Sequence, residues 1–191
     1  MTAFGAAVAL VGSVVPTSAD QVSQWQPFIS EASERFGVPE RWIWHVIAIE
    51  SAGKVQVNGR PIRSPAGAMG LMQLMPATWV SMRDALHLGS DPDDPHDNII
   101  AGTAYLRAMY DNFGYPGAFA AYNAGPARYA NYLAGKGALP SETRAYLQNM
   151  TVRTGAGPAH PGMQPPPLFA VRNVEIGGNP DGLFAFKRPL P

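Results

Sequence analysis

Glu50 is a carboxylate at a position where its helix is expected to bury an apolar side chain. The helix is predicted over residues 39–51, and its buried stripe contains Ile43, Val46 and Ile47 at i, i+3 and i+4. Glu50 follows at i+7 on the same stripe. Partial burial raises the pKa of a carboxyl group, and the nearby helix C-terminus also disfavours negative charge. An acid that stays protonated near neutral pH can protonate the leaving oxygen of a glycosidic bond. The alternative is a boundary glutamate that turns to solvent at a frayed helix end.

A second carboxylate is missing from the sequence around Glu50. No Asp or Glu occurs between Ser51 and Arg83. Glycosidases that use two carboxylates need the partner roughly 5–10 Å away, so a more distant acid would have to fold back. A reaction in which a 2-acetamido group of the substrate is the internal nucleophile needs no such partner. The acids that remain candidates for a partner are Asp84, Asp91, Asp93, Asp94, Asp97 and Glu142.

Composition excludes several other classes of protein. The chain of 191 residues has 14 Lys+Arg and 14 Asp+Glu, and no basic stripe of the kind that nucleic acid requires. It has no cysteine, so disulfides, thiolate chemistry and zinc–thiolate sites are impossible. The histidines show no ligand spacing, and we expect neither a metal nor a cofactor. They are His45, His87, His96 and His160.

The middle of the chain, residues 20–154, is predicted to be an all-α domain. Apolar residues recur at helical spacing between glycine and proline breaks, and no alternating strand pattern is visible. Asp97 is expected to cap the longest helix. The predicted helices span residues 22–36, 39–51, 76–86, 98–112, 117–123, 126–134 and 141–153.

The two ends of the chain differ from this domain. Residues 1–19 carry no charge, and an apolar run at 6–15 is followed by proline and small residues. This resembles the second half of a secretory signal peptide without its basic start, and it predicts export. A packed or mobile N-terminal segment is the alternative. Residues 155–191 form a Pro/Gly-rich C-terminal tail, expected to be extended or disordered.

Four sequence blocks resemble those of one known family. In this order and with these gaps they are similar to the soluble lytic transglycosylase (SLT) domain, a relative of goose-type lysozyme. The resemblance covers about residues 22–153 and implies a lysozyme-like helical domain. The blocks are Ile49–Ser51, Ser64–Thr78, Ala121–Gly125 and Glu142–Tyr146.

The resemblance implies a specific activity on peptidoglycan glycan strands. Family members cleave the β-1,4 bond between N-acetylmuramic acid and N-acetylglucosamine without water, and they leave a 1,6-anhydromuramoyl end. Glu50 matches the single catalytic glutamate of the family, which acts first as acid and then as base. The substrate implies a periplasmic location after export.

The second block contains three residues that the resemblance places in the substrate site. Ser64 matches a hydroxyl near the catalytic acid, Met72 matches a wall of the cleft, and Gln73 matches an amide that holds substrate. The alternatives are a turn-forming role for Ser64 ahead of Pro65 and ordinary core packing for the other two.

The resemblance places three more residues, from the last two blocks, in the substrate site. Tyr122 matches a residue near the substrate acetamido group, with Asn123 beside it, and Tyr146 matches a tyrosine that lines the cleft. A tyrosine buried by its ring, with its hydroxyl satisfied locally, is the alternative for Tyr122. Glu142 is expected to favour its helix N-terminus rather than take part in chemistry.

Several features lie outside the resemblance. The stretch 52–61 differs from the family pattern and lacks its phenylalanine, which leaves the neighbouring contacts open. Trp42, Trp44 and Trp79 could stack sugars, but at least one of the first two is expected in the core or at the surface. The acid-rich loop 90–97 is interpreted as a turn and a helix cap, because it lacks the pattern of an EF-hand.

Two other functions use the same residues. One is a hydrolytic muramidase, in which water attacks in place of the muramoyl 6-hydroxyl. The other is a non-catalytic wall-binding component of a secretion or conjugation machine, with the tail 155–191 as the segment that engages this partner.

Overall fold

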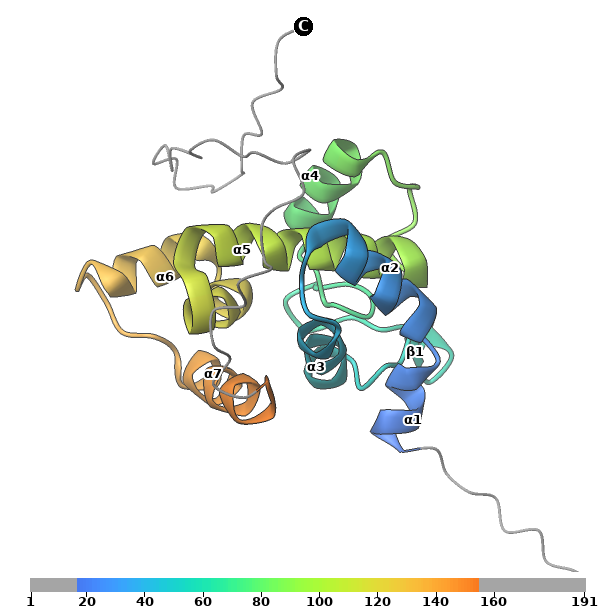
Figure 1. Ribbon diagram of the computed structural model, residues 1–191, viewed down its shortest axis with the longest axis horizontal. Helices are drawn as coiled ribbons and strands as arrows, with labels where there is room; N and C mark the ends of the chain where they lie inside the picture. The colour runs from blue at the N-terminus through green and yellow to red at the C-terminus, as the bar shows by residue number, and fades with distance from the viewer. Residues whose placement is uncertain (1–16, 155–191) are drawn as a thin grey trace, which may run out of the picture.

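The computed structural model describes residues 17–154, which form helices packed around one long central helix (Figure 1). The central helix α5 contacts α2, α4, α6 and α7, and α3 packs against α1, α2 and α7. The predicted all-α class is therefore confirmed. The helices are α1 (Ser18–Ser23), α2 (Gln26–Phe36), α3 (Glu40–Glu50), α4 (Pro76–Leu86), α5 (Pro95–Ala124), α6 (Pro126–Leu133) and α7 (Ser141–Thr154).

The first predicted helix, residues 22–36, is two helices in the structure. Pro27 lies in the first turn of α2, where its missing N–H is tolerated, but a continuous helix would place its ring against the carbonyl of Ser23. The chain therefore breaks at Trp25, whose indole Nε1 donates to the Gly53 carbonyl over 2.9 Å. α1 begins at Ser18, two residues before the predicted start of the domain, with Thr17 as its cap.

The long helix α5 begins earlier than predicted. Asp94 is its cap and accepts a hydrogen bond from the Asp97 N–H at 2.9 Å, so Asp97 lies inside the first turn and is not the cap. The interpretation of the acid-rich loop as a turn and cap holds, with a different aspartate in that role. The predicted break before residue 117 is present as a kink, since Gly114 and Tyr115 have non-helical backbone angles.

A short hairpin was not predicted. Strands β1 (Gln56–Val57) and β2 (Arg60–Pro61) pair in an antiparallel manner. Asn58 and Gly59 join them, and both have positive φ (54° and 71°), as a two-residue type I′ turn requires. The hairpin lies within the stretch that departs from the family pattern.

The core lies between α5 and the helices around it. Trp42 and Trp79 belong to it, at 5% and 4% exposure, whereas Trp44 is half-buried. Full burial of one such apolar side chain contributes about 1.5–3 kcal/mol to stability. The largest fully buried side chains are Phe119, Ile29, Ile43, Ile47, Leu71, Met72, Leu74, Ile99, Ile100, Leu106, Met109 and Met150.

The predictions for the two ends concern residues 1–16 and 155–191, which lie outside the described residues. The signal segment and the Pro/Gly-rich tail therefore stay predictions. Within residues 17–154, no helix is long and apolar enough to cross a membrane.

Candidate active site

Glu50 is the last residue of α3 and is partly buried. The stripe that precedes it, Ile43, Val46 and Ile47, is fully buried in the core. Burial raises the pKa of Glu50 to about 7, and the negative charge of Glu142 adds to the rise. The Tyr146 hydroxyl stabilises the carboxylate form of Glu50 and so lowers the pKa, which offsets part of the rise. Glu50 is thus an acid that carries its proton about half of the time near neutral pH.

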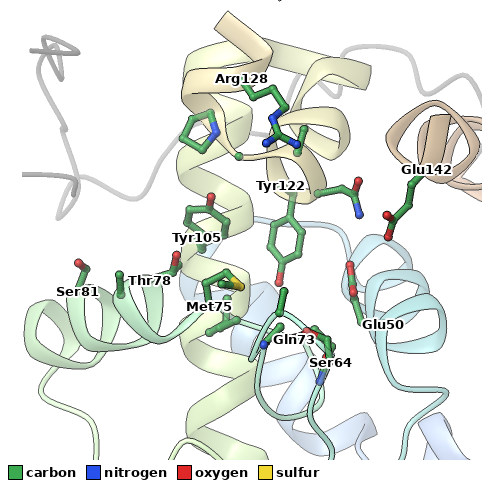
Figure 2. Close-up of a pocket in the computed structure, with 18 residues that line it drawn as sticks. Glu50, Ser64, Gln73, Met75, Thr78, Ser81, Tyr105, Tyr122, Arg128 and Glu142 are labelled. Carbon is green, nitrogen blue, oxygen red and sulfur yellow. Dashed lines mark hydrogen bonds between the residues drawn. The ribbon is translucent and has the colours of Figure 1, made fainter. Parts of the chain in front are cut away.

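Glu50 faces a cleft of about 550 Å³ (Figure 2). The walls come from α3, α4, α5, α6, α7 and from residues 62–75, which we call the cleft loop. This volume suits a ligand of several hundred daltons, such as part of a glycan strand. Of the predicted site residues, the cleft brings together Glu50, Ser64, Gln73, Tyr122 and Asn123.

Ser64 and Gln73 are held in the cleft loop by local hydrogen bonds. The Ser64 hydroxyl accepts from the Ala68 N–H at 3.0 Å, which is the turn-forming role considered as an alternative. Its own proton remains free to donate into the cleft. Gln73 has a positive φ of 49°, and its Nε2 donates to the Gly70 carbonyl at 2.8 Å. These bonds fix where both side chains enter the cleft.

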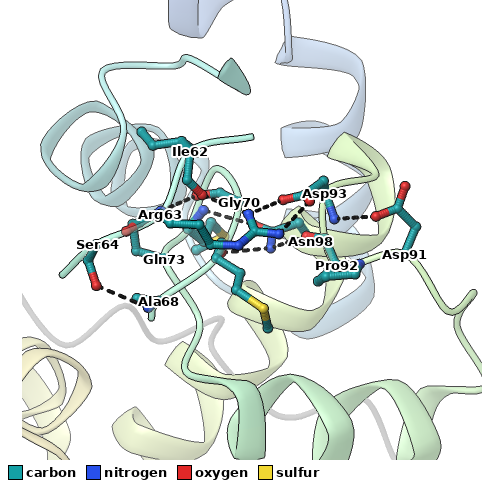
Figure 3. Close-up of polar contacts among 12 residues, drawn as sticks. Ile62, Arg63, Ser64, Ala68, Gly70, Gln73, Asp91, Pro92, Asp93 and Asn98 are labelled. Carbon is teal, nitrogen blue, oxygen red and sulfur yellow. Dashed lines mark hydrogen bonds and ion pairs between the residues drawn. The ribbon is translucent and has the colours of Figure 1, made fainter. Parts of the chain in front are cut away.

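Asn98 on α5 anchors the cleft loop (Figure 3). Its side chain is fully buried, and its Oδ1 accepts from the Met72 N–H at 2.8 Å. Its Nδ2 donates to the carbonyls of Met69 at 3.2 Å and Pro92 at 3.0 Å. One buried amide therefore pairs with three backbone groups of two loops. The Met69 carbonyl also accepts from the Leu74 N–H, whereas the other two groups would be costly to leave unpaired.

A second anchor joins the same two loops at the surface. Arg63 donates to both carboxylate oxygens of Asp93, at 2.5 and 2.6 Å (Figure 3). It also donates to the carbonyl of Ile62 at 2.7 Å. This bidentate pair fixes both distance and direction between the cleft loop and the segment that leads into α5.

Met72 does not form a wall of the cleft. Its side chain is fully buried and faces α5, where a Cβ on Gly102 would lie 2.5 Å from its sulfur. The predicted role is therefore wrong for the side chain. Its backbone carbonyl does reach the site, because it accepts a hydrogen bond of 2.7 Å from the Tyr122 hydroxyl. The exposed methionine that lines the cleft is Met75.

Asn123 near the end of α5 and Tyr146 on α7 have different surroundings. The Asn123 Oδ1 accepts from the Thr143 hydroxyl at 2.8 Å, so its NH₂ group is the part left for a ligand. Tyr146 is 5% exposed and does not line the cleft. Its hydroxyl has no protein partner at full hydrogen-bonding geometry, but it is near enough to Glu50 to stabilise the carboxylate. Tyr146 therefore acts on Glu50 more directly than on a ligand.

The structure brings to the cleft Glu142, one of the acids left open as a partner of Glu50, and several residues that were not predicted. Glu142 belongs to the cleft rather than only to its helix end, and in Figure 2 its carboxylate lies toward Glu50. Arg128 lies three residues after the third sequence block, and this short separation along the chain was the sequence signal that could have placed it near the cleft. Tyr105 packs its ring against that of Tyr122, with the ring centroids 5.2 Å apart, and no sequence motif marked it as a site residue. The remaining unpredicted polar residues of the cleft are Thr78 and Ser81.

One group of side chains has atoms close enough to bind a cation. Ligand atoms of Asp94, His96 and Asp97 lie within 4.8 Å of one another. All three already make protein contacts: Asp94 caps α5, and His96 lies between Asp97 at 2.9 Å and Glu31 at 3.1 Å. None of them lines the cleft. This group ties α2 to the start of α5.

The chain matches the model of a known domain family. The family model of the transglycosylase SLT domain matches residues 27–144. The chain belongs to this family, and its fold is the lysozyme-like helical fold of SLT domains.

Relatives of known name and structure agree with this. The soluble lytic murein transglycosylase of Escherichia coli (strain K12) is 35% identical over 131 residues, which cover 59% of this chain and 20% of that protein. The crystal structure of the 70-kDa soluble lytic transglycosylase of E. coli superposes with a TM-score of 0.59 at 31% identity, covering 68% of this chain and 23% of the other. The lytic transglycosylase Slt of Pseudomonas aeruginosa, in an inactive mutant with a glutamate replaced by glutamine, superposes with a TM-score of 0.56 at 30% sequence identity. The superposition covers 65% of this chain and 22% of the other. The chain thus spans about a fifth of the length of these relatives.

Proposed function

We propose that this protein is a lytic transglycosylase that cleaves the β-1,4 bond between N-acetylmuramic acid and N-acetylglucosamine in peptidoglycan. The observation that carries the proposal is Glu50, an acid with a pKa of about 7 at the wall of a glycan-sized cleft. Membership of the SLT family and the names of the relatives support the same activity. The inactive glutamate-to-glutamine mutant of the P. aeruginosa relative supports a glutamate as its catalytic group.

In the first step Glu50 is the acid. Its proton passes to the glycosidic oxygen as the bond from that oxygen to C1 of the muramoyl unit breaks. The carbonyl oxygen of the muramoyl 2-acetamido group attacks C1 and forms an oxazolinium ion. Because the substrate supplies this nucleophile, the chain needs no second carboxylate at the anomeric carbon.

Tyr122 is suited to stabilise this cationic intermediate. Its proton is used in the bond to the Met72 carbonyl, so its oxygen offers only lone pairs to the cleft. A lone pair can accept a hydrogen bond from the acetamido N–H, which becomes more acidic as positive charge develops. Such a contact is stronger in the transition state than in the ground state, which is what lowers a barrier.

In the second step Glu50 is the base. It takes the proton of the muramoyl 6-hydroxyl, whose oxygen attacks C1 while the bond from C1 to the acetamido oxygen breaks. The product is a 1,6-anhydromuramoyl end, and Glu50 is again protonated. A pKa of about 7 suits both steps, because the group must give and take a proton at the same pH.

Glu142 favours a second candidate, a hydrolytic muramidase. It is another carboxylate that lines the cleft and acts on Glu50 through its charge, and a second carboxylate can serve as the base that orients a water. Mass spectrometry of digested sacculi separates the two reactions. We expect 1,6-anhydromuramoyl ends, whereas reducing ends in their place would establish hydrolysis.

The proposed activity also has consequences for the location of the protein and for its C-terminal tail. Peptidoglycan as the substrate implies that the protein works after export, in the periplasm. The tail 155–191 is proposed to contact secretion or conjugation machinery rather than the glycan. Deletion of this tail is then expected to leave glycan cleavage by the purified protein intact, and a folded truncation without activity would contradict this.

A further inference from the structure

Among the described residues that line the cleft, Arg128 is the single cation. It extends from α6 into the cleft, whereas Glu50 and Glu142 enter from α3 and α7 (Figure 2). The cleft therefore has acidic groups on the α3 and α7 wall and a guanidinium group on the α6 wall. Neutral sugars need no cation, so the position of Arg128 calls for an anionic group in the ligand.

The fold gives Arg128 no structural role among the described residues. Within residues 17–154, its side chain is exposed and forms no hydrogen bond or ion pair with the protein. It lies in the first turn of α6, where the helix dipole disfavours a positive charge. By contrast, Arg63 and Arg107 each bind an aspartate. Arg128 thus remains free to bind a ligand.

We propose that Arg128 binds a carboxylate of the muramoyl unit and so makes the cleft selective for muramoyl strands over neutral glycans. This rests on the proposed function. The carboxylate belongs either to the peptide stem or, where the stem has been removed, to the lactyl group. A guanidinium group matches a carboxylate with two parallel hydrogen bonds. N-acetylglucosamine has no such group, and Thr78 and Ser81 on α4 offer it only neutral hydroxyls.

Binding to a protein that cannot turn over the ligand tests the proposal. The parent is the full chain with Glu50→Gln, and the variants add Arg128→Gln, Arg128→Lys or, as the matched control, Arg41→Gln. Arg41 is exposed on α3 and does not line the cleft. Calorimetry uses four tetrasaccharides: muramoyl strands with tripeptide stems, the same with amidated carboxylates, the same with stems removed, and a neutral N-acetylglucosamine tetramer.

We expect Arg128→Gln to weaken binding of the stem-bearing ligand by roughly tenfold, with Arg128→Lys in between and Arg41→Gln unchanged. The amidated and neutral ligands should bind the parent and Arg128→Gln equally. Loss confined to the stem-bearing ligand assigns the stem carboxylate, loss confined to the stem-free ligand assigns the lactyl carboxylate, and a loss with both shows that Arg128 binds either one.

Two results would overturn the inference while leaving the proposed function in place. One is equal affinity of the parent and Arg128→Gln for both carboxylate-bearing ligands. The other is an equal loss with the amidated ligand, which would make Arg128 a contact to the sugar. A parent that binds none of the four ligands would overturn the proposed function, and this inference with it.

Discussion

The Tyr122 hydroxyl donates to the Met72 carbonyl over 2.7 Å, and this bond fastens the cleft loop to α5 at the site itself. It links the second and third sequence blocks, which lie 50 residues apart in the chain. It also fixes the orientation of the hydroxyl, whose lone pairs then face the cleft. A single hydrogen bond thus positions one candidate catalytic group and one loop that carries others.

Tyr122→Phe is expected to lower both stability and activity. The Met72 carbonyl loses its partner in a buried position, which costs about 1–3 kcal/mol in the free energy of unfolding. The loss of the oxygen should lower kcat more than it raises KM, because the contact is strongest in the transition state. Urea unfolding and steady-state release of muropeptides measure the two effects. Tyr132→Phe, at an exposed tyrosine on α6, is the control, and equal kcat values for the two variants would contradict the role of Tyr122.

The partly buried Glu50 should make the protein less stable as pH rises. Its pKa is about 7 in the folded state against an ordinary value of 4.5, so between these values the folded state holds a proton that the unfolded state has lost. The loss of folding stability caused by ionising Glu50 is absent below pH 4.5, grows between pH 4.5 and about pH 7, and is complete above that pH. It amounts to at most about 3 kcal/mol in the free energy of unfolding. Glu50→Gln removes it.

Unfolding measurements at pH 4 and pH 8 test this linkage. The variant should gain stability relative to wild type as the pH is raised, while Glu34→Gln, at an exposed glutamate on α2, should not. A difference between Glu50→Gln and wild type that stays constant with pH would show that the carboxyl group is not held in its neutral form.

Tyr146→Phe should move the pH profile of the reaction. The Tyr146 hydroxyl lowers the pKa of Glu50, so its removal raises that pKa. The first step requires protonated Glu50, and the fall in kcat/KM at alkaline pH should therefore shift to higher pH. An unchanged profile, or a shift to lower pH, would mean that the phenol does not act on Glu50. A purely structural role would lower the rate without moving the profile.

The two anchors of the cleft loop should differ in their contribution to stability. Asn98→Ala leaves the Met72 N–H and the Pro92 carbonyl without their partner and removes one of two hydrogen bonds to the Met69 carbonyl, so it should cost roughly 3 kcal/mol. Arg63→Gln removes an ion pair whose side chains are 37% and 21% exposed, and should cost less than about 1 kcal/mol. Denaturation midpoints compare the two. A larger loss for Arg63→Gln would reverse this ranking.

Local patterns predicted most of the fold. The predicted bounds of α3, α4, α6 and α7 match the structure within one residue, because a proline or a capping serine marks each start and a glycine closely follows the end of α3, α6 and α7. The hairpin was missed although Asn58-Gly59 is a strong turn signal, since two-residue strands show no alternation. The start of α5 was missed because Asp94 and Asp97 are equally good caps by type, and only the Asp97 N–H bond distinguishes them.

The candidate site was harder to predict than the fold, because it depends on which side of a loop faces the cleft. Met72 and Gln73 are neighbours, yet one side chain fills the core and the other lines the cleft. The positive φ of Gln73 makes this turn, and side-chain type does not reveal it. Glu142 and Arg128 reach the cleft only through the packing of α7 and α6 on α5, which no local pattern encodes.

The most direct test of the central claim is the release of soluble muropeptides from purified sacculi by wild type, Glu50→Gln and Glu34→Gln. We predict that Glu34→Gln matches wild type and that Glu50→Gln, folded and at equal concentration, releases at least roughly a hundredfold less, since removal of a general acid costs about 10²–10⁴ in rate. Equal release by Glu50→Gln and wild type would contradict Glu50 as the catalytic acid and base. No release by wild type would favour the non-catalytic, wall-binding alternative.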